Sequence, residues 1–388
     1  MRNKLDIFIF IDALGWEVIK NRPFLEKELP YRTSAKMQFG YSCTAIPTIL
    51  TGVPPTEHKH LSFYYYAPDK SPFKLFKYLG LKYMPSALTD NWRVRHKFSK
   101  IVARHYGYSG YFELYSMPFD KIQYFDYIEK TDLFVPGGLA PVPNIADQLV
   151  ERKIPYHISN WRLSEQENID ALLSDIDKKD ISFAFLYTAA MDALLHRVTK
   201  DGREITPKLE WYSERIKKVI DKAHKNYKDV SIHVMSDHGM TTLTETVDVK
   251  KQVESLPFKF GKDYAATYDS TMGRFWFFND KARKTICECL MSIPHSNIVS
   301  EADKKRFMIN FDDNMYGETY LLMDPGVQIV PSHMGIKPLP GMHGFSPDHE
   351  DSDASFLSSE PFNNDINWVG DYHKEMLYCM DRLVKIKQ

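Results

Sequence analysis

The stretch IPYHISNWRLSEQENIDALLSDIDKKDISFAFLY, residues 154–187, decides the fold class. It begins with a short apolar run, continues with an amphipathic helical pattern and ends with a second apolar run. Short buried strands that alternate with helices favour parallel pairing, so this stretch predicts a strand, a helix and a second strand. The same alternation is found in LDIFIFI at residues 5–11, NIADQLVERK at residues 144–153 and VSIHVM at residues 230–235. The predicted fold is α/β, with a mainly parallel sheet and helices on both faces.

Two segments interrupt this alternation. Residues 63–142 are aromatic, partly basic and only weakly periodic, which predicts an insertion that caps the sheet. Residues 245–335 are also less regular, and their strongest strand candidate is GRFWFF at residues 273–278. We expect this segment to form a smaller antiparallel subregion within the core. The catalytic core is accordingly predicted to comprise residues 1–62 and 143–388.

The composition is that of a globular protein without a dominant charge. Of 388 residues, 43% are hydrophobic, and 50 Lys and Arg balance 51 Asp and Glu, so nothing predicts binding to a nucleic acid polymer. The four cysteines form neither a CxxC pair nor an evident disulfide framework, which favours a reducing compartment. No apolar run approaches the roughly 18 residues of a membrane span, and the first run ends at Asp12 without a cleavage site. We expect a cytoplasmic protein, whose oligomeric state the sequence leaves open.

Polar residues that follow the predicted strands are the first candidates for a site, because ligands of open α/β sheets bind beyond the carboxyl ends of the strands. Asp12 ends the first apolar run. In YTAAMDALLH, Asp192 and His196 are four residues apart, so on a helix both point from one face and can bind one metal ion. Asp12 alone could equally cap a turn, and the other two could form a surface pair.

Two later motifs offer further metal ligands. MSDHGM places Asp237 and His238 directly after a buried strand, where a turn can present both side chains to one ion. PLPGMHGFSP places His343 between glycines, whose backbone freedom lets the imidazole point inward. Taken singly, the first motif could be an ordinary polar turn and the second an exposed loop histidine.

The segment GYSCTAIPTILTG, residues 40–52, raises the question of a nucleophile. It predicts a helix that ends at Gly52, with Ser42, Cys43 and Thr44 near its beginning. Backbone amides and the helix dipole favour an anion at such an N-terminus. Small polar residues also begin many helices simply as caps, so the segment alone does not select a nucleophile.

As an ordered set, IFIDALGW, YSCTAIPTILTG, YTAAMDALLH, MSDHGM and GMHGF resemble the alkaline phosphatase superfamily, and most closely its type I phosphodiesterase and nucleotide pyrophosphatase branch. The resemblance covers nearly the whole chain and implies a phosphoester hydrolase with two divalent metal ions. A mixed imidazole and carboxylate shell suits Zn²⁺, with Mn²⁺ as the alternative. The resemblance assigns one ion to Asp12, Ser42, Asp237 and His238, and the other to Asp192, His196 and His343.

The resemblance also selects Ser42 as the nucleophile. The nucleophile of the superfamily lies ten positions before the glycine of the TG pair, and that glycine is Gly52 here. A serine hydroxyl is a weak nucleophile at neutral pH, and metal coordination would activate it to form a phosphoserine intermediate. Sulfatases of the superfamily modify a Cys or Ser within Cys-x-Pro-x-Arg, but Cys43 is followed by TAIPT. An unmodified serine is therefore expected.

Two departures from the family pattern bear on the substrate. The segment HLSFYYY, residues 60–66, has no counterpart of the asparagine that orients phosphate in nucleotide pyrophosphatases, and His58-Lys59 replaces the usual His-Gly. We expect a small phosphodiester or nucleotide-linked substrate, because the aromatic insertion could stack a base or sugar. A phosphomonoesterase, a phosphonate hydrolase or a phosphotransferase with the same metal site is the alternative. A catalytically silent binding protein is disfavoured by the complete ligand set.

The insertion contains one candidate substrate-binding segment, NWRVRHKF at residues 91–98. If it is extended, Arg93 and Arg95 share a face and could bind the far half of a diester, with Trp92 as a stacking surface. If it is helical, the two guanidinium groups diverge. The alternative is a solvated basic surface whose aromatic side chains pack into the cap.

Overall fold

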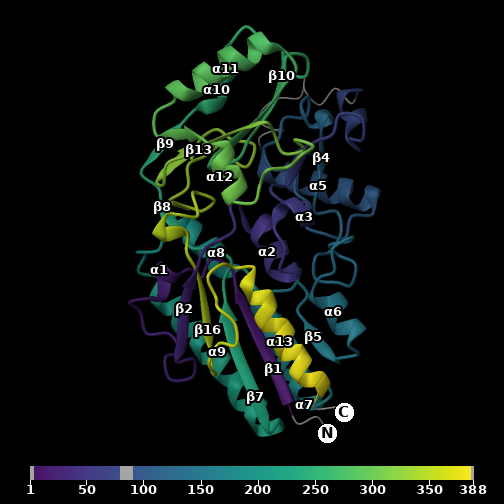
Figure 1. Ribbon diagram of the computed structural model, residues 1–388, viewed down its shortest axis with the longest axis vertical. Coiled ribbons are helices and arrows are strands. Elements are labelled where there is room, and N and C mark those ends of the chain that lie inside the picture. The colour runs from purple at the N-terminus through teal and green to yellow at the C-terminus, as the bar shows by residue number, and fades with distance from the viewer. Residues whose placement is uncertain (1–3, 79–90, 386–388) are drawn as a thin grey trace. The chain divides into compact units, whose positions relative to one another are not determined.

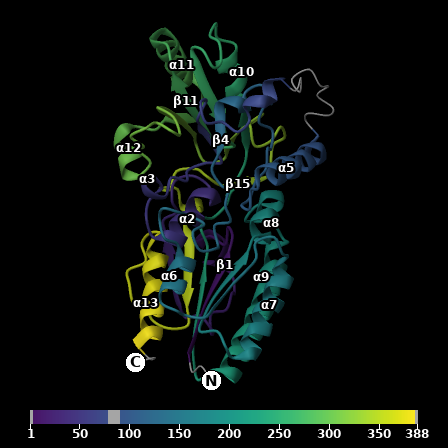
Figure 2. The same ribbon diagram turned by 90° about the vertical axis from the view of Figure 1, so that its right-hand side faces the viewer.

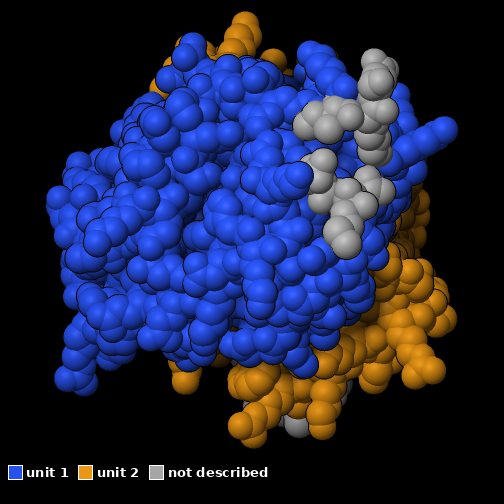
Figure 3. Space-filling view, turned by 90° about the horizontal axis from the view of Figure 1, so that it is seen from below, with its two compact units in different colours: residues 1–58, 133–242, 347–388 blue, residues 59–132, 243–346 orange. Residues whose placement is uncertain are grey.

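The computed structural model describes residues 4–78 and 91–385, which form two compact units. The chain crosses between the units several times, so each unit joins segments that are distant in the sequence. Unit 1 comprises residues 1–58, 133–242 and 347–388, and unit 2 comprises residues 59–132 and 243–346, coloured blue and orange in Figure 3.

Unit 2 contains most of the two segments that interrupt the strand and helix alternation. Residues 59–132 include most of the predicted cap, and residues 243–346 include the predicted antiparallel subregion. Residues 133–142, the last part of the predicted cap, belong instead to unit 1. The assignment of a catalytic core and a covering cap stays a prediction.

A six-stranded sheet in the order β2-β16-β7-β1-β6-β5 forms the centre of unit 1. Strands β7, β1, β6 and β5 are mutually parallel, whereas β16 runs antiparallel to both β7 and β2. Figure 1 shows β16, β7 and β1 side by side. The predicted mainly parallel sheet is confirmed. The strands are β1 Lys4–Ile11, β2 Tyr31–Ala35, β5 Tyr156–Ile158, β6 Phe183–Thr188, β7 Asp229–Met235 and β16 Ala354–Ser358.

Helices cover both faces of this sheet because the side chains of β1 alternate between two hydrophobic clusters. Ile7 and Ile9 pack with α7 and α9 on one face, and Phe8 and Phe10 pack with α2, α6 and α13 on the other (Figure 2). Complete burial of each such side chain contributes about 1.5–3 kcal/mol. The helices and short elements of unit 1 are α1 Trp16–Ile19, α2 Ser42–Thr51, α3 Pro55–His58, α6 Ile145–Glu151, α7 Glu165–Lys178, α8 Ala190–Val198, α9 Ile205–Asn226, α13 Asp371–Lys385, β8 Thr241–Thr242 and the 3₁₀ turn η4 Glu350–Ser352.

Helix α2 begins at Ser42 and ends before Gly52, as the sequence predicts. Gly52 has φ +72°, and a Cβ there would collide with the side chain of His373 on α13. Both the left-handed backbone and the close approach require glycine. The TG pair therefore fixes where α2 stops and lets it pack against α13.

Unit 2 is built on a four-stranded antiparallel sheet, in the order β10-β11-β13-β12, with an aromatic core. Tyr64, Tyr127 and Trp276 are among the buried rings of that core. Its elements are β3 Tyr64–Tyr66, η1 Lys74–Tyr78, α5 Trp92–Tyr106, η3 Ile122–Tyr124, β4 Phe125–Tyr127, β9 Glu245–Val247, α10 Val249–Glu254, β10 Tyr264–Tyr268, β11 Met272–Phe277, α11 Asp280–Ser292, β12 Ser296–Ile298, α12 Glu301–Arg306, β13 Thr319–Met323, β14 Val327–Ile329 and β15 Gly341–Met342.

A buried arginine joins the two sequence segments of unit 2. Arg274 on β11 is fully buried, and its guanidinium group pairs with the carboxylate of Asp269 at 3.2 Å. It also donates to the Ser62 hydroxyl at 2.8 Å and to the Tyr64 carbonyl at 2.9 Å. Removing one member would leave the others buried without partners, which is costly. This network therefore connects residues 59–132 to residues 243–346.

No helix within residues 4–78 and 91–385 is both long enough and apolar enough to span a membrane.

We expect Glu129→Gln to stabilise the protein at alkaline pH. Burial raises the pKa of Glu129 from 4.5 to about 8, so folding favours the protonated carboxyl group. The wild type should therefore lose stability as the pH rises from about 5 to about 8, by a few kcal/mol in total, because the unfolded chain releases this proton first. Glutamine carries no such proton.

Denaturant unfolding of both proteins between pH 4 and pH 9 measures this effect. The two curves should nearly coincide at pH 4, with the variant more stable at pH 9. A constant difference across the range would contradict the protonation of Glu129.

Candidate functional site

Three neighbouring parallel strands bring predicted site residues to one edge of the sheet in unit 1. Asp12 follows β1, Asp237 and His238 follow β7, and α8 with Asp192 follows β6. Strands β7 and β6 each pair with β1 in parallel register, so their carboxyl ends lie together. This is the edge at which ligands of open α/β sheets bind.

Asp12, Asp237 and His238 form a compact buried cluster. One ligand atom from each lies within 4.8 Å of the others, and all three side chains are at most slightly exposed. The Nε2 atom of His238 is 3.2 Å from Asp237 Oδ2 and 3.7 Å from Asp12 Oδ1. The side chains are thus close enough to coordinate one ion.

Hydrogen bonds orient the ring of His238. Its Nδ1 lies 2.9 Å from the carbonyl oxygen of Gly239, which can only accept, so Nδ1 carries the proton. Nε2 of the neutral ring therefore presents a lone pair. The Ser42 hydroxyl lies 2.9 Å from that Nε2. The predicted metal ligand His238 and the candidate nucleophile Ser42 are therefore in direct contact.

The carboxylates of Asp12 and Asp237 indicate what this cluster is built to bind. Asp237 Oδ1 accepts hydrogen bonds from the backbone amides of Ala13 at 3.2 Å and His238 at 3.1 Å. Asp237 Oδ2 and Asp12 Oδ1 are buried and have no hydrogen-bond donor within the described ranges. Buried carboxylate oxygens without donors are costly unless a cation binds them. The donor set of two carboxylates and one imidazole fits a divalent metal ion.

The pKa shifts of Asp12 and His238 also indicate that the cluster is suited to a cation. Burial raises the pKa of Asp12 well above 3.8, and the neighbouring charges of Asp237 and Asp192 raise it further. Burial alone would lower the pKa of His238, but the carboxylates of Asp237 and Asp192 outweigh burial and raise it. The potential at the cluster is thus negative, and a bound cation would neutralise it.

The second predicted ligand set consists of Asp192, His196 and His343, and the structure brings the first two together. Asp192 and His196 lie on α8, and His196 Nε2 is 3.3 Å from Asp192 Oδ1, so the predicted spacing does put both on one helical face. Both side chains are about one fifth exposed, at 22% and 20%. His343 follows β15 in unit 2 and is buried. Its membership of this set stays a prediction.

The beginning of α2 distinguishes the three candidate nucleophiles. Ser42 is partly exposed, and its hydroxyl reaches the His238 ring. Cys43 and Thr44 are buried, and the Thr44 hydroxyl accepts a hydrogen bond from the backbone amide of Tyr41 as part of the helix cap. Among the three, Ser42 therefore has the geometry that nucleophilic attack beside a metal ion requires.

Residues 7–257 match the sequence profile of the family described as Type I phosphodiesterase / nucleotide pyrophosphatase. The chain belongs to this family. It is accordingly a hydrolase that acts on phosphoester bonds. The family is metal-dependent, and the buried cluster supplies candidate ligands for an ion.

Solved structures confirm the fold. Murine ectonucleotide pyrophosphatase / phosphodiesterase 5 is 13% identical, with a TM-score of 0.69 over 97% of this chain and 95% of that chain. The human protein of the same name is 11% identical, with a TM-score of 0.68 over 97% and 95%. An inactive form of the murine protein in complex with AMP is 13% identical, with a TM-score of 0.67 over 98% and 95%. No curated protein matches the sequence.

Two glycines support the turns that carry the predicted metal ligands, and the sequence reasoning missed them. Gly15 and Gly239 follow the ligand turns after β1 and β7, and a Cβ on Gly15 would overlap the backbone of Gly239. A Cβ on Gly239 would overlap the carbonyl oxygen of Asp351. Only glycine allows the two turns to approach so closely. The sequence signal that could have revealed them is a glycine within three residues after Asp12 and another within three residues after Asp237.

A half-buried acid positions the helix that carries Asp192, and it was also missed. Glu165 at the start of α7 accepts a hydrogen bond from the Ala190 amide at 3.1 Å, at the N-terminus of α8. Its carboxylate also accepts from Lys208 and from the Tyr212 hydroxyl. Because the N-terminus of a helix favours negative charge, this contact stabilises the orientation of α8. From the sequence alone, Glu165 looks like an ordinary first-turn residue of a helix.

The segment 91–98 begins α5, so it is helical and Arg93 and Arg95 diverge. Arg95 is buried, donates to the carbonyls of Tyr115 at 2.7 Å and Met117 at 2.9 Å, and thereby supports unit 2 internally. Arg93 is exposed, as is 69% of Trp92. The shared face that the extended alternative required is therefore absent from this helix. Substrate binding by Trp92, Arg93 and Arg95 stays a prediction.

We expect Gly239→Ala to weaken binding of divalent metal by at least about tenfold, as loss of the support around metal ligands commonly does. The added methyl group must displace the backbone at Asp351 and hence the turn that holds Asp237 and His238. Isothermal titration of metal-depleted protein with Zn²⁺ measures the affinity. Gly335→Ala is the matched control, because a Cβ at Gly335 meets no atom within 4 Å. Equal affinities of the two variants would contradict the role of the glycine contact.

Proposed function

We propose that the chain hydrolyses a small phosphodiester or nucleotide-linked substrate, and that Ser42 is its nucleophile. The observation that carries the proposal is the 2.9 Å contact between the Ser42 hydroxyl and His238 Nε2, beside buried carboxylate oxygens of Asp12 and Asp237. This contact joins the start of α2 to the turn after β7. A hydroxyl at that place is well suited to attack a phosphorus atom bound at the same edge of the sheet.

The start of α2 also suits the substrate. The first turn of a helix presents backbone amides and positive dipole potential, which favour the phosphoryl oxygens. Helix α2 runs from Ser42 to Thr51, long enough to have an appreciable dipole. The phosphoryl group would therefore be bound next to the attacking hydroxyl, which is the arrangement that increases the rate of an in-line displacement.

The reaction has two displacements. In the first, the Ser42 oxygen forms a bond to phosphorus and gives up its proton, while the bond from phosphorus to the leaving oxygen breaks and that oxygen takes up a proton. In the second, water attacks the phosphoserine, restores the hydroxyl and releases the phosphate product. No redox partner or further reactant is required.

The metal ligands of the proposed site are assigned from the family pattern and supported by the donor set. Asp12, Ser42, Asp237 and His238 would hold one divalent ion, and Asp192, His196 and His343 a second. An ion of this kind lowers the pKa of a serine hydroxyl and offsets the negative charge of the phosphoryl group. Zn²⁺ suits imidazole and carboxylate ligands, and Mn²⁺ is the alternative.

The AMP complex of the murine neighbour supports a nucleotide-linked substrate, although that ligand belongs to a protein only 13% identical. The missing asparagine in residues 60–66 favours the second candidate, a phosphomonoesterase with the same metal ligands. The two candidates differ in whether a second ester group on phosphorus is accepted.

We expect the purified enzyme to hydrolyse bis-p-nitrophenyl phosphate with a higher kcat/KM than p-nitrophenyl phosphate. The physical reason is that a diesterase binds the second ester group, whereas a monoesterase stabilises a second negative charge on the phosphoryl group, which a diester lacks. Release of p-nitrophenol gives both rates under the same conditions. A preference for the monoester would establish the second candidate instead.

We expect Ser42→Ala to lower kcat by at least about 10³-fold, because loss of a covalent nucleophile removes the main reaction path. Cys43→Ala and Thr44→Val are the neighbouring controls and should retain most activity, since neither side chain is placed to attack. Stopped assays for turnover and for trapped phosphoenzyme measure the effect. If Thr44→Val were the inactive variant, the assignment of Ser42 would be wrong.

A further inference from the structure

Unit 1 contains a second set of side chains of metal-ligand type, outside the proposed active site. His233 lies on β7, Cys379 lies on α13, and Glu360 follows β16. One ligand atom from each lies within 4.8 Å of the others. His233 precedes Asp237 by four residues, which corresponds to about 13 Å along an extended strand. The two sets are therefore separate.

The local packing holds the imidazole and the thiol in place. The His233 ring stacks on Phe8, with ring centroids 4.3 Å apart and an interplanar angle of 14°. Cys379 lies on the buried face of α13, and its Sγ is 4.0 Å from His233 Nε2. The aromatic stack fixes the ring plane, and within that plane Nε2 lies on the side of the thiol.

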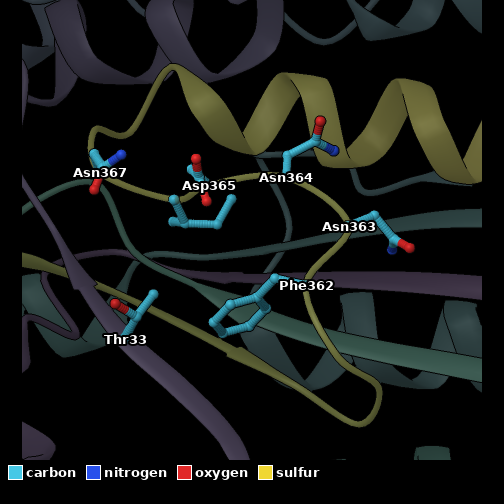
Figure 4. Close-up of a pocket in the computed structure, with 7 residues that line it drawn as sticks. Thr33, Phe362, Asn363, Asn364, Asp365 and Asn367 are labelled. Carbon is cyan, nitrogen blue, oxygen red and sulfur yellow. The ribbon is translucent and has the colours of Figure 1, made fainter.

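The carboxylate of Glu360 is oriented by a residue that is not part of the set. Arg382 Nη1 donates to Glu360 Oε1 at 2.9 Å, which orients the carboxylate through one of its oxygens. The loop that follows is anchored by the buried carboxylate of Glu375, which accepts from the side-chain amides of Asn363 at 2.7 Å and Asn364 at 2.8 Å. Figure 4 shows this loop, which also lines a hollow of about 690 Å³.

The polar atoms of the buried pair are poorly satisfied. The thiol of Cys379 is fully buried, and its polar contact is the long one to His233. A fully buried imidazole and thiol contribute little as an ordinary hydrogen bond at this distance. Their juxtaposition with a carboxylate has a better explanation as a ligand set.

We propose that His233, Glu360 and Cys379 bind a divalent transition metal ion of the Zn²⁺ class, which fastens α13 to strands β7 and β16. Imidazole, thiolate and carboxylate are the ligands that such ions prefer. Tetrahedral Zn²⁺ with these bond lengths separates sulfur and nitrogen by about 3.5 Å, close to the distance found. On binding, the thiol releases its proton to solvent, and the charges of thiolate and carboxylate neutralise the ion. A water molecule fills the fourth position.

Titration of the full-length protein with Co²⁺ after metal removal tests this proposal. A Co²⁺–thiolate bond gives an intense near-ultraviolet charge-transfer absorption, which oxygen and nitrogen ligands do not give. The wild type should develop this absorption, and Cys379→Ser should lose both the absorption and one equivalent of bound Co²⁺. Cys287→Ser is the matched control and should keep both, because Cys287 lies on α11 in unit 2.

Asp237→Asn separates this ion from the one at the proposed active site. It should lower catalysis and retain the thiolate absorption. Absence of the absorption in the wild type, or its persistence in Cys379→Ser, would overturn the proposal. If Cys379→Ser does not fold, Glu360→Gln replaces it as the decisive variant, because Glu360 is partly exposed. It should weaken Co²⁺ binding at the absorbing site by at least about tenfold, and an unchanged affinity would overturn the proposal.

Discussion

The site in unit 1 depends on how the fold accommodates the buried carboxylates of Asp12 and Asp237 at the ends of adjacent strands. Burial and the neighbouring charge of Asp237 both disfavour the charged form of Asp12 and raise its pKa. Two backbone amides satisfy one oxygen of Asp237, and the facing oxygens of both residues lack donors in the described part of the chain. A divalent cation would resolve this conflict, so the same arrangement that costs stability without metal would create affinity for one.

The rest of unit 1 supports this arrangement by bringing backbone segments unusually close. Gly15 and Gly239 let the turns after β1 and β7 touch, and Gly52 lets α2 end against α13. The Ser42 hydroxyl thereby meets His238. Strand β7 has a role at two places along its length, because His233 faces Cys379 on α13 while the residues after its end belong to the proposed active site.

Much of this could be predicted from the sequence. Alternating strand and helix patterns predicted the parallel sheet, because burial on both faces requires continuous apolar strands. The motifs around Asp12, Asp192 and Asp237 predicted the family, and the ends of β1, β6 and β7 do lie together. The sequence left one backbone conformation open, because RVR in residues 93–95 fits a strand or a helix equally well. The helix buries Arg95 and exposes Arg93.

The sequence by itself determined the fold class, the family and the local spacing of candidate ligands, since each depends on periodicity or on short motifs. The tertiary structure alone decided which hydroxyl reaches His238 and which glycines must lack a side chain. It also decided that His233 on β7 and Cys379 on α13, which are 146 residues apart in the sequence, face each other. Contacts of this kind depend on how helices pack on strands, and no local pattern in the chain records that packing.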